Sequence, residues 1–235
     1  MMKKISFIHH LLDVVAPRFC VVCHHRLSVS EQVICAACNL HLPRTNFCQQ
    51  PLDNMLARLF WGIIPVERAA ALFYYEAGSQ TANILYDLKY HDHPEIGNVM
   101  GRMIAREFSE AGFFEGIDVI VPVPLSRSRQ FWRGYNQSLE LARGISNVTG
   151  IPVARNAIRR LRFNKTQTHL GHTDRRENVD GVFQLKDATL IEGRHVLLVD
   201  DVITTGATMT SCAQELLKAN NVRLSLLSLG FVKAI

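Results

Sequence analysis

The sequence lacks any long apolar run. No segment approaches the about 18 consecutive apolar residues that a membrane-spanning helix needs. An apolar stretch at residues 5–15 is interrupted by His9, His10 and Asp13, and no small-residue cleavage site follows it. We therefore expect a short amphipathic helix that ends before Pro17, no signal peptide, no membrane insertion and a cytoplasmic location.

Low-complexity runs and internal repeats are also missing, and no sign of charge dominates. Charged residues make up 20% of the 235 positions and hydrophobic residues 48%, so a largely disordered chain is excluded. The net charge of +5 suits phosphate or nucleic-acid ligands, although ordinary soluble proteins reach it too. The length allows one α/β domain with a small appendage.

Cysteine is scarce except near the N-terminus, where five of the six cysteines fall within residues 17–50. Two C-x2-C pairs separated by eleven residues predict a tetrahedral structural Zn²⁺ site, because each pair can supply two thiolates. Four unligated thiols or a redox pair are the alternative. We expect residues 1–50 to form a helix and this zinc module, with 51–68 as a linker. The predicted zinc ligands are Cys20, Cys23, Cys35 and Cys38.

From residue 69 onward, strand-like and helix-like patterns alternate. Such alternation predicts an α/β domain over 69–235, with a mostly parallel sheet flanked by helices on both faces. The expected strands are 69–75, 119–123, 182–185, 195–199 and 222–229; the expected helices are 80–90, 97–111, 137–149 and 207–219.

The sequence contains neither a Walker loop nor a Gly-x-Gly-x-x-Gly turn, but one other phosphate-loop candidate is present. Asp200 and Asp201 follow the expected strand 195–199, where open α/β sheets bind ligands. Residues 203–208 then turn into a helix, whose free N–H groups suit a phosphate, and Gly206 permits close approach. The carboxylates can accept from sugar hydroxyls or act through Mg²⁺. An ordinary turn capped by threonine is the alternative.

The segment from Val196 to Thr208 resembles the signature with which type I phosphoribosyltransferases bind phosphoribosyl pyrophosphate (PRPP). The match covers thirteen consecutive positions: four apolar residues, two acids, two variable residues and Thr-Thr-Gly-x-Thr. The resemblance implies that Asp200 and Asp201 hold the ribose hydroxyls and that PRPP binds with Mg²⁺. It further implies a 5′-phosphate cradle formed by Thr204, Thr205, Gly206, Ala207 and Thr208.

Two basic segments supply candidate partners for the pyrophosphate. Residues 122–137 contain Arg127, Arg129 and Arg133 without an acid, and arginine suits phosphate because its planar group donates in pairs. Residues 163–178 are too polar for a core and suggest a mobile lid. Each segment taken alone is equally consistent with a solvated basic face. Trp132 and Tyr135 either stack on a base or pack on the sheet.

The chain as a whole resembles the ComF/GntX family of phosphoribosyltransferase-like proteins over about residues 11–230. The resemblance implies that Arg133, Gly134, Asn136 and Gln137 face the pyrophosphate, and it implies a role in competence and uptake of single-stranded DNA. Many members carry a further C-x2-C pair, of which only Cys48 remains here, so a second zinc is not expected. The motifs that carry the resemblance are Leu88-Lys-Tyr90, Pro122-Val-Pro124, Arg133-Gly-Tyr-Asn-Gln137, Gln167 with Arg175/Arg176-x-Asn178, Gly181-Val-Phe183, the PRPP loop and the cysteine pairs.

Two hypotheses on function follow from this resemblance. The first is an enzyme that transfers the phosphoribosyl group of Mg-PRPP to an acceptor, with Asp200, Asp201 and Arg133 as catalytic residues. The second is a non-catalytic module that senses PRPP or a nucleotide and binds single-stranded DNA or a helicase partner in DNA uptake. The sequence indicates neither the acceptor nor the oligomeric state.

Overall fold

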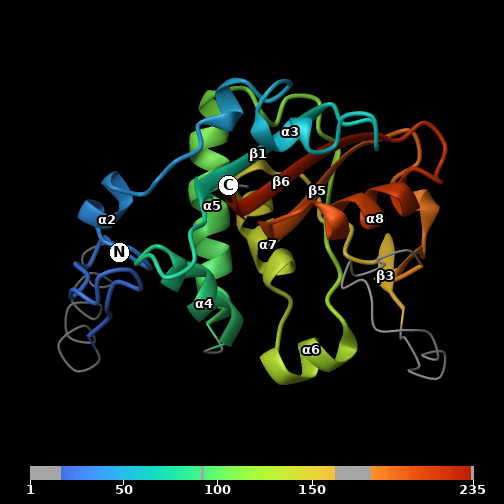
Figure 1. Cartoon of the computed structure of the whole chain (residues 1–235). Helices are drawn as coiled ribbons and strands as arrows, with labels where there is room; N and C mark the ends of the chain where they lie inside the picture. The colour runs from blue at the N-terminus through green and yellow to red at the C-terminus, as the bar shows by residue number, and fades with distance from the viewer. Residues whose placement is uncertain (1–16, 91–92, 162–180, 234–235) are drawn as a thin grey trace, which may run out of the picture.

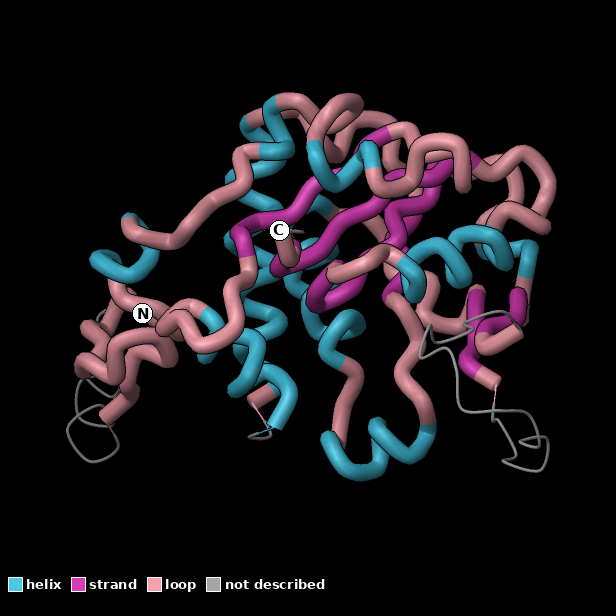
Figure 2. The backbone as a smooth tube through the Cα atoms, in the orientation of Figure 1, coloured by secondary structure: helices cyan, strands magenta, loops and turns pink. Residues whose placement is uncertain are grey.

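A four-stranded parallel sheet forms the centre of the protein. The computed structural model describes residues 17–90, 93–161 and 181–233, so the expected N-terminal helix and the segment 163–178 lie outside the described residues. The strands follow the order β1-β6-β5-β2 (Figures 1 and 2). They are β1 (Arg68–Tyr74), β2 (Val119–Pro122), β5 (His195–Ile203) and β6 (Arg223–Phe231).

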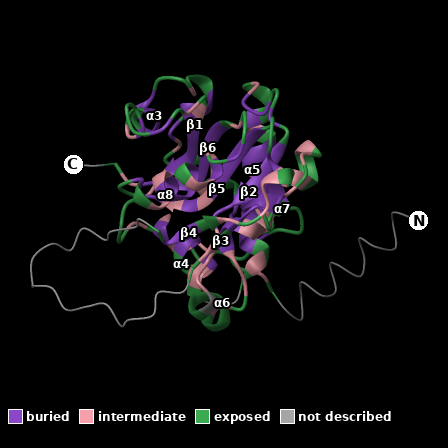
Figure 3. Ribbon diagram, turned by 90° about the vertical axis from the view of Figure 1, so that its right-hand side faces the viewer, coloured by how far each residue is buried: buried purple, intermediate pink, exposed green. Residues whose placement is uncertain are grey.

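Helices cover both faces of this sheet, which confirms the expected α/β class. Helices α5 (Pro94–Glu110) and α7 (Gln137–Thr149) lie on one face and α8 (Ala207–Leu216) on the other (Figures 1 and 3). The first two approach each other closely because glycines meet where they cross. A Cβ atom on Gly101 would lie 2.3 Å from the carbonyl oxygen of Leu141, so even alanine would force the helices apart.

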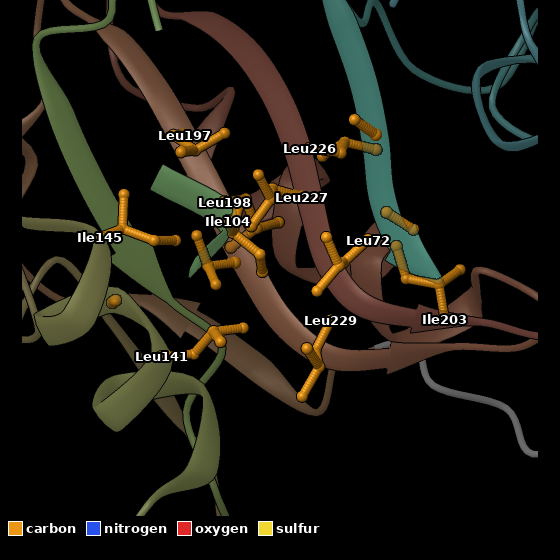
Figure 4. Packing of buried hydrophobic residues seen from close by; sticks show 14 of the residues in the cluster. Leu72, Ile104, Leu141, Ile145, Leu197, Leu198, Ile203, Leu226, Leu227 and Leu229 are labelled. Atoms are coloured by element: carbon orange, nitrogen blue, oxygen red, sulfur yellow. The ribbon is translucent and has the colours of Figure 1, made fainter. Parts of the chain in front are cut away.

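The core lies between these layers and is continuous. Because both faces are covered, strands β5 and β6 are apolar on both sides rather than alternating. Figure 3 shows the strands as buried along most of their length. Figure 4 shows buried side chains of the sheet, among them Leu72, Leu197 and Leu226, together with Ile104 of α5 and Leu141 and Ile145 of α7.

Three parts of the fold differ from the sequence-based expectation. The strand expected at 182–185 is β4 (Phe183–Leu185), which pairs antiparallel with β3 (Ile158–Arg160) in a separate two-stranded sheet. A helix that the sequence did not predict, α6 (Arg127–Arg133), follows β2. Residues 51–68, which were expected to be a linker, contain α3 (Met55–Arg58) and bury Leu56 and Phe60.

The cysteine-rich segment contains α2 (Ala36–Leu40) and the short 3-10 helix Phe47–Gln49, and it lies beside α4 (Ala82–Tyr90) in Figure 1. Between α2 and the 3-10 helix Phe47–Gln49, the chain runs along the outer edge of β1. The N–H of Thr45 donates to the carbonyl oxygen of Leu72 (3.1 Å), and that of Tyr74 to Pro43 (2.8 Å). The described helices include none that is long and apolar enough to cross a membrane.

Candidate ligand-binding site and cysteine cluster

Strand β5 carries the two aspartates beyond the point where its neighbour β2 ends. The strand was predicted to end at Val199, but it continues to Ile203 because β6 pairs with it over that whole length. On its other side, β2 ends at Pro122, opposite Val199. Asp200 and Asp201 therefore lie just beyond the last residue of β2, at the carboxyl ends of the strands, where ligands bind in open α/β sheets.

The surroundings of the Asp200 carboxylate shift its pKa strongly. Its Oδ1 atom accepts hydrogen bonds from the Ser138 hydroxyl (2.8 Å) and from the N–H of Asp201 (2.9 Å). Burial, and then the neighbouring charge of Asp201, raise the pKa of Asp200 to about 7, although Ser138 and Lys89 act in the opposite direction. Asp200 is consequently close to half ionised at neutral pH.

A lysine that the sequence analysis did not select is the counter-ion of this pair. Lys89, near the end of α4, places its Nζ atom 3.3 Å from Oδ2 of Asp201, and both side chains are largely buried. The ion pair joins α4 to the end of β5. Its only signal in the sequence was the Leu88-Lys-Tyr90 motif.

A hollow of about 190 Å³ opens over the two carboxylates and is referred to below as the carboxylate hollow. It brings together residues from six helices and strands, and six of the predicted site residues line it. The predicted ones are Arg133, Gln137, Asp200, Asp201, Thr204 and Thr208; those not predicted to line it include Lys89, Ser138 and Arg160.

The start of α8 forms one end of this hollow. Thr204 and Thr205 are exposed, and Gly206 has a left-handed φ of 78° as the N-cap residue of the helix. Gly206 is buried beneath the Phe60 ring, so a Cβ atom there would lie 3.0 Å from a ring carbon. Ala207 begins the helix, whose first N–H groups have no partner within it and suit an anion.

The two ends of the loop between α6 and α7, Arg133 and Gln137, also line the hollow. Arg133 donates to Oε1 of Gln137 (3.2 Å), and its guanidinium lies 5.4 Å from the centre of the Tyr90 ring. Gln137 is 1% exposed, and its Nε2 atom has no hydrogen-bond partner among the described residues. Because an unpaired buried amide is unfavourable, this donor fits a ligand oxygen.

Two other predicted residues of this loop have local roles. Gly134 ends α6 with a φ of 73°, and the Asn136 side chain caps α7 by accepting from the N–H of Ser138 (3.0 Å). The Tyr135 hydroxyl donates to the carbonyl oxygen of Leu88 in α4 (2.6 Å), a contact that was not among the two alternatives predicted for this ring. Trp132, in contrast, is 85% exposed.

The four predicted zinc ligands come together in the cysteine-rich segment. The sulfur atoms of Cys20, Cys23, Cys35 and Cys38 all lie within 4.8 Å of one another. Glu31 fixes the second pair by accepting from the backbone N–H groups of Ser28 (2.7 Å) and Ala36 (2.6 Å). Cys48 is buried outside this cluster.

The electrostatics of these thiols fit a bound cation. Burial opposes ionisation of Cys20, but backbone N–H groups of Cys23, Cys35 and Val22 stabilise its thiolate, and its pKa falls to about 7. Burial, followed by hydrogen bonds with neighbouring cysteines, raises the pKa of Cys38. Ionisation of Cys38 beside the Cys20 thiolate is therefore disfavoured unless a cation compensates, as one would at a four-thiolate zinc site.

The parallel sheet, the paired carboxylates at the end of β5 and the glycine-threonine turn into α8 define a protein of the phosphoribosyltransferase class. Residues 88–229 match the family described as "Phosphoribosyl transferase domain". The chain belongs to this family, and within it to the ComF/GntX group.

Two named relatives agree with that assignment. "DNA utilization protein YhgH" of Escherichia coli O157:H7 is 30% identical over 207 residues, which cover 85% of this chain and 84% of the relative. "Competence protein F" of Haemophilus influenzae (strain ATCC 51907 / DSM 11121 / KW20 / Rd) is 40% identical over 102 residues, 43% of this chain and 44% of the relative. A solved "structure of the allosteric regulatory enzyme of purine biosynthesis" aligns with 22% identity and a TM-score of 0.39, covering 60% of this chain and 29% of that one.

Proposed function

We propose that the carboxylate hollow binds Mg-PRPP and that the protein transfers the phosphoribosyl group to a nitrogen acceptor. The observation that carries the proposal is the convergence in one hollow of two carboxylates, the threonines of a helix start and several cations. An ordinary capped turn requires none of the groups that α4, α6 and β3 contribute. Each group has a counterpart in the ligand: hydroxyls, a 5′-phosphate and a pyrophosphate.

The residues divide these tasks according to their places. Asp200 and Asp201 accept hydrogen bonds from the ribose hydroxyls, and residues 204–208 donate to the 5′-phosphate. Arg133 and Lys89 stabilise the pyrophosphate, and the unpaired Nε2 of Gln137 donates to a ligand oxygen. A buried amide without a partner costs about 1–3 kcal/mol, so a hydrogen bond from Nε2 to a ligand oxygen would favour binding.

The site also fits a magnesium ion. Asp200 and Asp201 are oxygen ligands of the kind that Mg²⁺ prefers, and a cation there would offset both causes of the raised pKa of Asp200, its burial and the neighbouring charge of Asp201. Bound Mg²⁺ supplies charge neutralisation on the pyrophosphate. In the transfer, the acceptor's nitrogen lone pair forms the bond to C1 of the ribose as the C1–O bond breaks. Pyrophosphate leaves with the electrons of that bond, and the nitrogen releases its proton to solvent.

The cysteine cluster is proposed to hold a structural zinc ion. Four thiolates from two C-x2-C pairs match its tetrahedral preference and leave no open position for a substrate. The metal would secure a segment whose own core is small.

Isothermal titration with Mg-PRPP tests the proposed function. We expect saturable heat with the wild type and none with the double variant Asp200→Asn/Asp201→Asn, while Asp53→Asn, an exposed ion-pair aspartate, serves as the matched control. Circular dichroism checks that each variant is folded. Absence of heat with the wild type would refute PRPP binding, and equal heat with the double variant would refute the assigned site.

A second function, binding of single-stranded DNA by a non-catalytic sensor, is favoured by a different observation. The relatives carry the names of DNA utilization and competence proteins, and α6 exposes Phe131 and Trp132 beside Arg129. Exposed aromatic and basic side chains are what sequence-independent single-strand binding uses. Binding of an oligothymidylate that falls with salt, is lost in Arg129→Ala/Arg133→Ala and persists in the aspartate double variant would support it. Pyrophosphate release from PRPP would identify an enzyme instead.

A further inference from the structure

A larger hollow adjoins the carboxylate hollow. It measures about 880 Å³ and is referred to below as the aromatic hollow. Lys89 and Tyr90 line it from the end of α4, and Arg129, Trp132 and Arg133 line it from α6. Figure 1 shows α6 standing away from the sheet, and Figure 3 shows it as largely exposed.

The two hollows share part of their walls. Lys89, Arg129 and Arg133 line both of them. A molecule in the aromatic hollow would thus lie next to the place where the ribose and its leaving group are proposed to bind. That is the position required of an acceptor, because its nucleophile must come within about 3–3.5 Å of the reacting carbon.

The aromatic side chains that line the hollow are exposed to water, although burying them would be energetically favourable. Trp132 is 85% exposed and Tyr90 62%, so two large rings from different helices remain in water. The loop that follows α6 is joined to α4 by the hydrogen bond from the Tyr135 hydroxyl to the carbonyl oxygen of Leu88. Tyr90 is further held between the Tyr86 ring, 5.0 Å away, and the Arg133 guanidinium. Two exposed rings that line one hollow suit a planar ligand, which gains by stacking.

The positive charge of the lining favours planar ligands that carry a negative charge. The lining includes Lys89, Arg129 and Arg133, and the described lining residues include no carboxylate. Lys89 is engaged by Asp201 and Arg133 by Gln137 and Tyr90, whereas Arg129 is exposed. A carboxylate on the ligand would complement this charge, since guanidinium and carboxylate form paired hydrogen bonds.

We propose that the aromatic hollow is the acceptor site and that the acceptor is an aromatic or heteroaromatic nitrogen compound carrying a carboxylate. Its ring stacks on Trp132, and its carboxylate pairs with Arg129. Its nitrogen forms the bond to C1 as pyrophosphate departs with the electrons of the C1–O bond, and a proton on the nitrogen, where there is one, goes to solvent. This inference rests on the proposed function, because PRPP supplies the phosphoribosyl group.

Tryptophan fluorescence tests the proposal directly. The chain has only two tryptophans, so Trp61→Phe leaves Trp132 as the sole reporter. Probes are the matched pairs nicotinate and nicotinamide, and anthranilate and anthranilamide, each added with Mg-PRPP. We expect at least one carboxylate to quench saturably, with a Kd about tenfold or more below that of its amide, as one charged hydrogen-bonded pair provides.

Variants assign the effect to residues. Arg129→Gln should remove the preference for the carboxylate. Trp132→Ala, followed by calorimetry, should weaken probe binding about tenfold, the value of one stacking contact. The matched control is Phe131→Ala, because Phe131 is equally exposed but does not line the hollow. PRPP binding should be unchanged in Trp132→Ala and Phe131→Ala.

The outcomes separate this inference from the proposed function. If the wild type gives no heat with Mg-PRPP, the proposed function fails, whatever the probes do. If PRPP binds but neither carboxylate is preferred over its amide, or if Trp132→Ala binds the probes as well as wild type, the acceptor site is refuted alone. Quenching by oligothymidylate without quenching by any small probe would also refute it and would assign Trp132 to nucleic acid.

Discussion

If the carboxylate hollow binds Mg-PRPP as proposed, the hydrogen bond from Ser138 to Asp200 influences how the affinity varies with pH, and one substitution tests this influence. Ser138→Ala removes a donor that stabilises the ionised carboxylate. A hydrogen bond to a charged group is worth about 1.5–3 kcal/mol, and each pKa unit corresponds to about 1.4 kcal/mol. The pKa of Asp200, about 7 in the wild type, should therefore rise by at least about one unit.

The size of the effect on binding follows if Mg-PRPP requires the ionised carboxylate. The apparent Kd then scales as 1 plus 10 raised to the power pKa minus pH, so a variant with a pKa near 8 binds about fivefold more weakly than wild type at pH 7. At pH 9 both proteins are ionised, and their affinities should agree to within about 20%.

The assay is isothermal titration of wild type and Ser138→Ala with Mg-PRPP from pH 6 to 9. Ionisation of PRPP itself is common to both proteins, so the difference between the two curves belongs to the protein. Two results would refute the reasoning: equal affinities at pH 7, or a ratio that stays constant up to pH 9. The second result would mean that the hydroxyl contacts the ligand rather than tuning Asp200.

Three further predictions concern stability. Gly206→Ala should lower the free energy of unfolding by about 1–3 kcal/mol more than Gly150→Ala does in urea titrations, because both glycines have positive φ but only Gly206 lies against Phe60; equal losses would show that the contact does not matter. Purified protein should contain zinc, and Cys35→Ser should lose the metal and have a lower Tm in a thermal scan. A wild type that purifies without metal, or whose Tm does not fall when a chelator removes the metal, would contradict this. Burial and nearby arginines lower the pKa of His195, so its contribution to stability is complete above about pH 6.5 and lost as pH falls below it, a loss that should vanish in His195→Gln.

Features encoded in consecutive residues could be predicted from the sequence. Helix α7 was placed at its observed limits because Asn136 caps its start and Gly150, with a φ of 74°, ends it. The turn into α8 was found for a similar reason, since Asp200, Asp201 and the glycine-threonine run adjoin each other in the sequence. The cysteine pairs were recognised from spacing alone, and their sulfur atoms do converge.

Features created by distant parts of the chain could not be predicted in this way. Lys89 reaches Asp201 only because α4 ends beside the end of β5, and the Leu88-Lys-Tyr90 motif alone does not indicate this ion pair. Ser138 looks like an ordinary helical serine in the sequence, because its hydrogen bond to Asp200 exists only once β5 packs beside α7. Helix α6 was missed because its seven residues are polar or exposed, so they show no apolar face to indicate a period.

The course of residues 43–45 along β1 has a consequence for the solubility of the chain. An uncovered edge strand offers unpaired N–H and carbonyl groups to other chains and is a template for aggregation. Here the segment after the cysteine cluster occupies the β1 edge, and at the opposite edge β2 is covered by residues 152–154, where Ile120 bonds to Pro152 and Ala154. Removing the N-terminal segment through residue 45 should therefore yield a domain that self-associates through β1. In this respect the cysteine-rich segment protects the sheet against other copies of the same chain.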